Sequence, residues 1–166
     1  MSLTPLEERS VLPFYLNMMG TNARRNATDL WPDLLRAGED VTLADASWLI
    51  SSGDRNWRPV VMGAWFSLKF DEHEIGEPLR RAMAESRGSL TAPPLAVACV
   101  VLLGRGATDA LASYPDPPDA SGSFVAAARE SVDGGQAEES TAEDRTAFAE
   151  MRAIGTSLRD AWRPTR

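Results

Sequence analysis

The sequence contains very little cysteine, lysine or histidine. Among its 166 residues Cys99, Lys69 and His73 are each the single member of their type. One cysteine excludes a disulfide within the chain, so nothing in the sequence indicates an oxidising compartment. Cys99 stands in the apolar run LAVACVVLL, where a buried packing role is expected rather than a reactive thiolate.

The single histidine also limits the catalytic and metal sites that the chain can build. A Ser-His-Asp triad would have to use His73, and the sequence has no G-x-S-x-G turn. His73 stands within Asp71-Glu72-His73-Glu74, and four consecutive residues do not converge on one ion without a special loop. We therefore expect no catalytic residue, no cofactor site and no metal site, and interpret this tetrapeptide as a solvated link between helices.

Long hydrophobic runs are absent as well. The longest, Leu95 to Leu103, has nine residues, whereas a membrane-spanning helix needs about 20. The first ten residues include Pro5, Glu7 and Glu8, where a secretory signal would carry a basic region. These features predict a cytoplasmic protein that has no membrane partner.

Sustained alternation of apolar and polar residues, the pattern of a half-buried strand, is also missing. Apolar residues instead recur at spacings of three and four, which predicts an all-α chain of about eight helices. We expect a single domain, residues 1–166, built as a compact HEAT-like stack of antiparallel helix pairs, with 115–140 rich in loops and partly mobile. Helices are predicted over 11–20, 32–37, 42–51, 57–70, 75–86, 91–103, 106–113, 123–131 and from Ser140 onward.

Expected helix boundaries come from glycine, proline and capping residues. The polar stretch 21–27 is interpreted as a connector, and Gly38 as the end of a short helix that starts at Pro32. Asp40 is a candidate N-cap for the next helix. Ser140 and Glu143 have the spacing of a capping box at the start of the final, amphipathic helix.

The stretch WRPVVMGAWFSLKF, residues 57–70, is expected to be the central helix. Its apolar face would consist of Val61, Ala64, Trp65 and Leu68, and the small pair Gly63-Ala64 would allow another helix to approach closely. Arg58 has two interpretations. It is either an internal brace, hydrogen-bonded within the protein and stacked on an indole, or a binding anchor, because arginine and tryptophan are enriched at interface hot spots.

Three segments carry a resemblance to a known family: VLPFYLNMM, NWRPVVMGAWFS and LLGRGATDAL. With their links they cover about residues 9–115, and the chain resembles the bacterial family catalogued as domain of unknown function 6000. The resemblance implies a HEAT-like stack of helices but no established activity and no catalytic residues. It also implies an immunity-type or partner-binding role, because some members occur in the gene neighbourhoods of toxins. After Tyr114 the sequence departs from the family pattern.

Negative charge is concentrated in the C-terminal part of the chain. The net charge is −7, and residues 106–150 contain ten acidic side chains but only two arginines. Such a segment favours a basic protein partner and disfavours nucleic acid, so the arginines Arg80, Arg81 and Arg87 are not interpreted as a phosphate site. The expected function is protein binding, including neutralisation of a basic toxin. Candidate partner-binding residues are Arg58, Trp57, Asp116, Asp119, Glu138 and Glu139.

Two further possibilities stay open at this point. One is an enzyme or small-molecule binder that uses a pocket between helices near Arg58 and His73. The other is an accessory domain that forms a homodimer through its C-terminal helix.

Overall fold

The computed structural model describes residues 2–53, 56–114, 121–134 and 140–163. Every regular element in these ranges is a helix, which confirms the predicted all-α class. The elements are α1 (Pro5–Ser10), α2 (Tyr15–Met18), α3 (Ala23–Asp40), α4 (Leu43–Ile50), α5 (Trp57–Ser67), α6 (Glu72–Glu85), α7 (Ala92–Leu103), the 3-10 turn η2 (Gly104–Gly106), α8 (Ala107–Ala112), α9 (Gly122–Asp133) and α10 (Ala142–Trp162).

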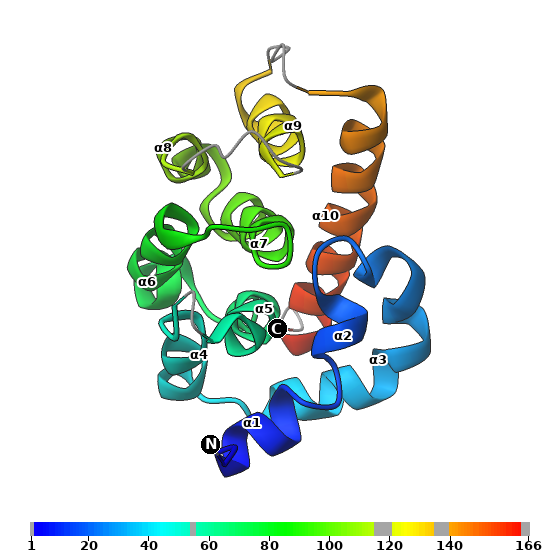
Figure 1. Ribbon diagram of the computed structural model, residues 1–166, viewed down its shortest axis with the longest axis vertical. Coiled ribbons are helices and arrows are strands. Elements are labelled where there is room, and N and C mark those ends of the chain that lie inside the picture. Colours follow the sequence, from blue (N-terminus) through cyan, green and yellow to red (C-terminus); the bar gives the residue numbers. More distant parts are fainter. Residues whose placement is uncertain (1, 54–55, 115–120, 135–139, 164–166) are drawn as a thin grey trace.

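The middle of the chain forms two parallel columns of helices. Helices α4, α6 and α8 make up one column, and α5, α7 and α9 make up the second beside it (Figure 1). The long helix α10 runs along the other side of the second column, packing against α7 and α9 and reaching α3. Helices α1, α2 and α3 lie at the end of the columns where α4 and α5 are found (Figure 1).

Helix α5 is buried along its whole central part, as the sequence predicts. Val61, Ala64 and Leu68 are 0% exposed, and Trp65 is 1% exposed. The indole Nε1 of Trp65 donates a hydrogen bond of 3.1 Å to the carbonyl of Met18, which satisfies its one polar atom and ties α2 to α5. The expected apolar face is therefore confirmed, and it is wider than predicted.

The close approach expected at Gly63-Ala64 is also present, and the neighbour is α4. A Cβ atom on Gly63 would lie 2.7 Å from the backbone nitrogen of Ile50. Backbone atoms cannot yield as the end of a flexible side chain can, so only glycine fits at this crossing.

Helix α3 was not predicted over its full length. It begins at Ala23, so it includes residues 23–27 of the stretch interpreted as a connector, and it continues through Pro32 to Asp40. The predicted helix 11–20 is too long, because only Tyr15–Met18 within it is α-helical. Arg24 and Arg25 lie on the exposed face of α3, whose buried residues are Ala23, Ala27, Leu34 and Gly38.

Gly38 does not end a helix; it gives space to Trp162 from α10. A Cβ atom on Gly38 would lie 2.3 Å from the Trp162 ring. The indole Nε1 of Trp162 donates a 3.1 Å hydrogen bond to the carbonyl of Leu35, and its ring packs against Phe66 with centroids 5.8 Å apart. The last helix is thereby fastened to α3 and α5.

Two helix starts use caps other than the predicted ones, and a third helix begins earlier than predicted. Thr42, not Asp40, caps α4, and its side chain forms a reciprocal capping box with Asp45. Thr141, not Ser140, caps α10 by accepting from the backbone N–H of Asp144 at 3.1 Å. The predicted break at Asp71-Glu72-His73-Glu74 is the start of α6, with Asp71 as its N-cap and Glu74 completing the box.

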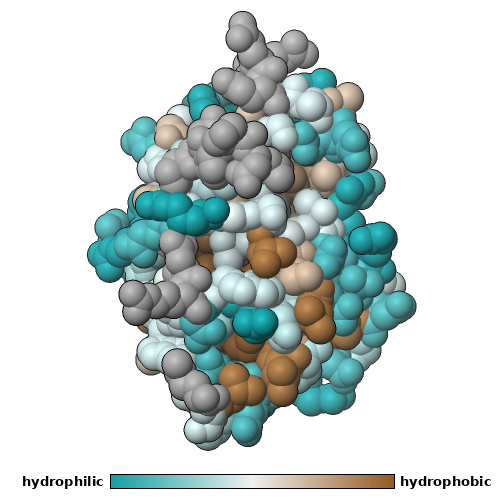
Figure 2. All heavy atoms as spheres, viewed as in Figure 1, coloured by the Kyte–Doolittle hydropathy of each residue, from teal (hydrophilic) through white to brown (hydrophobic). Residues whose placement is uncertain are grey.

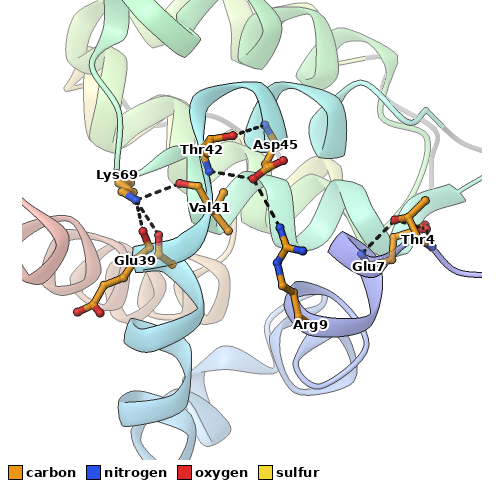
Figure 3. A network of polar contacts seen from close by, with 9 residues as sticks. Thr4, Glu7, Arg9, Glu39, Val41, Thr42, Asp45 and Lys69 are labelled. Carbon is orange, nitrogen blue, oxygen red and sulfur yellow. Dashed lines mark hydrogen bonds and ion pairs between the residues drawn. The ribbon is translucent and has the colours of Figure 1, made fainter.

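The single lysine has a defined structural role at the C-terminal end of α3. Its Nζ donates hydrogen bonds to the carbonyls of Gly38, Glu39 and Val41 at 3.0, 2.8 and 3.0 Å (Figure 3). Lys69 thus satisfies carbonyls that have no partner within the helix, with a charge that suits the negative end of the helix dipole.

One helical stretch, Ala92–Ala112, is long and apolar enough to cross a membrane by length and composition alone. Of its most apolar window, 61% is buried inside the protein. A central core helix passes the same test, and α7 packs against α5, α6, α9 and α10. Polar residues cover much of the surface, whereas apolar ones gather in the lower half of the face shown in Figure 2.

Candidate functional site

The first two residues of α5 form an aromatic and cationic cluster with α2. The rings of Trp57 and Tyr15 meet edge to face, with centroids 5.7 Å apart and an interplanar angle of 72°. The guanidinium carbon of Arg58 lies 4.7 Å from the Trp57 ring centroid and 5.2 Å from that of Tyr15. Each such contact contributes about 0.5–1 kcal/mol at an exposed position. Arg58 is therefore held in place by two rings.

Arg58 is exposed, and its contacts change the interpretation drawn from the sequence. The predicted stacking on an indole is confirmed. The predicted internal hydrogen bond is wrong: within the described part of the chain, no hydrogen bond or ion pair involves the Arg58 guanidinium. The five N–H donors of the guanidinium are available to a ligand, and the side chain is already fixed in position. This arrangement favours a binding anchor over a brace.

Helix α1 is joined to the start of α5 by hydrogen bonds of the Glu7 carboxylate. The Glu7 carboxylate accepts from the backbone N–H and the hydroxyl of Thr4 at 2.8 and 2.9 Å. It also accepts a 3.2 Å hydrogen bond from the side-chain amide of Asn56, the residue before Trp57. These donors, the Thr4 backbone N–H foremost, lower the pKa of Glu7 below its ordinary value of 4.5. A buried carboxylate thus ties α1 to the start of α5.

Two exposed leucines flank Tyr15. Leu12 is 53% exposed and Leu16 is 56% exposed, in a part of the chain where α1 and α2 lie on the apolar lower half of Figure 2. We call the set Leu12, Tyr15, Leu16, Trp57 and Arg58 the α2 surface. An isolated exposed leucine is ordinary, but these two lie within three residues of Tyr15, whose ring contacts Arg58, and exposed apolar residues near arginine and tyrosine are typical of interfaces. Exposed Leu3 and Trp48 belong to neighbouring α1 and α4 segments.

A cavity of about 240 Å³ adjoins this surface at Trp57. It lies where α4 and α6 end and α5 and α7 begin. The apolar part of its wall consists of Ile50, Trp57, Val60, Ala82 and Leu90, and the polar part of Glu85, Ser86, Arg87 and Thr91.

The polar groups of this cavity are largely occupied by one another. The hydroxyls of Ser86 and Thr91 share a hydrogen bond of 2.7 Å. Arg87 donates to the carbonyls of Ala84 and Ser86, both at 3.1 Å, at the end of α6. The cavity therefore offers mainly an apolar interior.

His73 lies far from this cavity. It stands in the first turn of α6, twelve residues before Glu85 on the cavity wall, so about 18 Å of helix separates them. A single pocket that combines Arg58 with His73, as the sequence suggested, is therefore not formed.

The ligand atoms of Asp71, His73 and Glu74 lie within 4.8 Å of one another. The Asp71 carboxylate is however engaged by two arginines of α10: it accepts from Arg163 and lies 3.6 Å from Arg159. The hydrogen bond from Arg163 is the main cause that lowers the pKa of Asp71. Asp71 and Glu74 cap α6, and Asp71 also binds the arginines at the end of α10, so two of the three side chains have structural roles.

A second depression lies between α9 and α10, with a volume of about 750 Å³. Phe148 and several alanines form its floor, and Arg145 and Arg152 stand on its wall. Arg145 lies 3.7 Å from the Glu130 carboxylate, whose side chain is only 8% exposed. The predicted dimer through the C-terminal helix would use this outer face of α10, and it stays a prediction.

The other candidates from the sequence have structural roles or lie outside the described residues. Cys99 is 0% exposed, and burial raises the pKa of its thiol to about 12, which fits packing and not reactivity. Arg80 and Arg81 pair with Glu72 and Glu77 at 3.1 and 4.0 Å. The acidic candidates Asp116, Asp119, Glu138 and Glu139 lie outside the described residues, as do the ends of the predicted loop-rich region 115–140.

No family model, curated protein or solved structure matches this chain. The resemblance drawn from the three sequence segments stays a prediction.

Proposed function

We propose that this chain is a helical protein-binding module whose partner contacts the α2 surface. The observation that carries this proposal is Arg58, an exposed guanidinium held on two aromatic rings and joined to no carboxylate of the described chain. Arginine, tryptophan and tyrosine dominate interface hot spots, because they bury much surface and lose little side-chain freedom when already fixed. The exposed leucines beside them supply apolar contact area.

The two columns of helices support a HEAT-like architecture within this proposal. Helix pairs stacked in register present a broad face to a partner. Helix α10 covers one side of the second column, so the binding face of this chain lies at the end formed by α1, α2 and the start of α5.

A second candidate function is neutralisation of a basic partner, such as a nuclease-like toxin, by an immunity-type protein. Its support is the charge of residues 106–150, where ten acidic side chains accompany two arginines. Charge of this kind accelerates association with a basic protein and weakens with salt. The two candidates differ in the residues involved, because the first depends on Arg58 and the second on the acidic segment.

A photo-crosslinking amino acid at Leu16 tests the first candidate, in cells or extracts of the native host. We expect a crosslinked product of defined mass from Leu16, and its loss when Arg58→Ala is added. The matched control places the same crosslinker at Glu77, an exposed residue of α6 outside the α2 surface. Equal products from both positions, or a product from Leu16 that is indifferent to Arg58→Ala, would refute the proposal.

Salt concentration separates the second candidate from the first. A partner held by the acidic segment is expected to dissociate as salt rises and to keep its binding in Arg58→Ala. The second candidate is contradicted if the partner stays bound at high salt and also stays bound after neutralisation of Asp116, Asp119, Glu138 and Glu139.

A further inference from the structure

Within the described chain, the Arg58 guanidinium lies against two aromatic rings and has no ion-pair partner. Within the described chain, the acidic groups around the start of α5 are already bonded: Glu7 to Thr4 and Asn56, and Asp45 of α4 to Arg9 and Thr42. On the cavity wall the charges of Glu85 and Arg87 are opposite in sign, and Arg87 is held by two carbonyls. The charges of Glu85 and Arg87 offset each other on the wall, so the net charge beside the start of α5 is positive and is located at Arg58.

Trp57 joins this charge to an apolar cavity. The Arg58 guanidinium carbon lies 4.7 Å from the centroid of its ring, and Trp57 also lines the 240 Å³ cavity. A dry cavity of about 150 Å³ already accommodates benzene, so this one can hold a large apolar side chain. Gly88 also lines this cavity, and a Cβ atom added there would meet nothing within 4 Å.

We propose that the partner binds through an acidic peptide segment in which an apolar side chain enters this cavity and a carboxylate pairs with Arg58. This inference rests on the proposed function, because it names the partner chemistry for the same surface. An extended peptide rises about 3.3 Å per residue, so a carboxylate two or three residues from the apolar side chain spans the Trp57 ring. The guanidinium fork binds a carboxylate through two parallel hydrogen bonds. Leu12 and Leu16 flank the site and contact the remainder of the segment.

Selection of short random peptides displayed on phage against the purified chain tests this chemistry directly. We expect enriched sequences with Asp or Glu two or three positions from Leu, Ile, Phe or Trp. Affinity of one enriched peptide, labelled with a fluorophore, is then measured by polarisation. Arg58→Ala is expected to weaken binding about tenfold or more, and Arg58→Lys to recover only part of it, since lysine lacks the planar fork.

Two further variants separate the cavity from the charge. Gly88→Leu adds a side chain to the lining of the cavity and leaves Arg58 in place, and it is expected to weaken binding of the peptide as well. Arg152→Ala removes an exposed arginine from the α9–α10 depression and changes the net charge equally, so it is the matched control and is expected to leave binding unchanged. Circular dichroism of each variant checks that the helices remain.

Several results would overturn the inference. These are enrichment of basic or uncharged peptides, the absence of any peptide that binds the wild type above Arg58→Ala, and an equal loss in Arg152→Ala. If the crosslink from Leu16 depends on Arg58 while selected peptides carry no acidic residue, this inference fails and the proposed function stands. If that crosslink is indifferent to Arg58, the proposed function itself fails.

Discussion

Replacement of Gly38 by alanine tests the packing of α3 against α10. Whether it raises or lowers the free energy of unfolding depends on Trp162. A Cβ atom at Gly38 would lie 2.3 Å from the Trp162 ring, so the ring has to leave its position. Displacement of the ring costs about 1–3 kcal/mol as overpacking, and loss of the hydrogen bond to Leu35 costs about 1 kcal/mol more. The gain from alanine within a helix is at most about 1 kcal/mol. Gly38→Ala is therefore expected to lower the free energy of unfolding by roughly 1–3 kcal/mol.

The same substitution reverses its effect when Trp162 is absent. In a Trp162→Ala background the three atoms nearest to the added Cβ are gone, so Gly38→Ala is expected to stabilise α3 by up to about 1 kcal/mol. Urea unfolding followed by circular dichroism gives the four free energies of this double-mutant cycle. Gly106→Ala is the control, because its nearest contact would be an ordinary 3.6 Å and its φ is −67°. Equal destabilisation by Gly38→Ala in both backgrounds would refute the reasoning.

Three further predictions concern the single lysine, the single cysteine and a buried acid. Lys69→Met removes the ammonium that donates to three carbonyls at the end of α3, and it is expected to lower the free energy of unfolding in urea by about 2 kcal/mol. Lys69→Arg is expected to recover part of this stability, because a planar guanidinium cannot donate to all three converging carbonyls. An unchanged free energy of unfolding in both variants would contradict this role. Cys99, with its thiol pKa raised to about 12 by burial, is expected to resist Ellman's reagent in the native protein and to react at the rate of unfolding in urea, whereas rapid native labelling would contradict the packing. Because the pKa of Glu7 is lower in the folded chain than its ordinary 4.5, the stability that it contributes is present above pH 4.5 and is lost as pH falls through the folded value. Glu7→Gln is accordingly expected to destabilise the chain at pH 7 and to flatten the decline of the unfolding midpoint below pH 4.5, and an unchanged decline would show that other acids cause it.

The central helix could be predicted from the sequence because its apolar residues are dense. Val61, Ala64, Trp65 and Leu68 satisfy helical spacing without reference to any distant residue, and all four are buried. The start of α6 was missed, although Asp71 and Glu74 have the capping-box spacing. Four consecutive polar residues indicate a solvated link by composition alone, and only the spacing of Asp71 and Glu74 indicates a helix start.

Helix α3 shows what local patterns leave out. Its buried residues Ala23, Ala27, Leu34 and Gly38 follow helical spacing, but they are small or widely separated among arginines and asparagines. Their burial depends on α10, which is more than a hundred residues later in the chain. Gly38 looked like a helix end because its actual reason for being glycine, the Trp162 ring, is invisible from its neighbours.

The candidate site was predicted in part for the same reason. Trp57 and Arg58 were identified from their residue types and their place at the start of a helix. Tyr15, the second ring under Arg58, lies 43 positions earlier, and no spacing rule connects the two. The cavity is assembled from the ends of four helices, so it arises only when the columns are packed.

The attachment of α10 has a consequence for how the protein is made on the ribosome. Arg159 donates to the carbonyls of Leu68 and Phe70 at 2.8 and 2.7 Å, and Trp162 occupies the space beside Gly38. Until these residues leave the exit tunnel, the nascent chain exposes the apolar side chains of α3 and α7 against which α10 packs. Helices synthesised before α10 therefore keep apolar surface exposed until α10 packs against them, and exposed apolar surface of this kind is bound by chaperones.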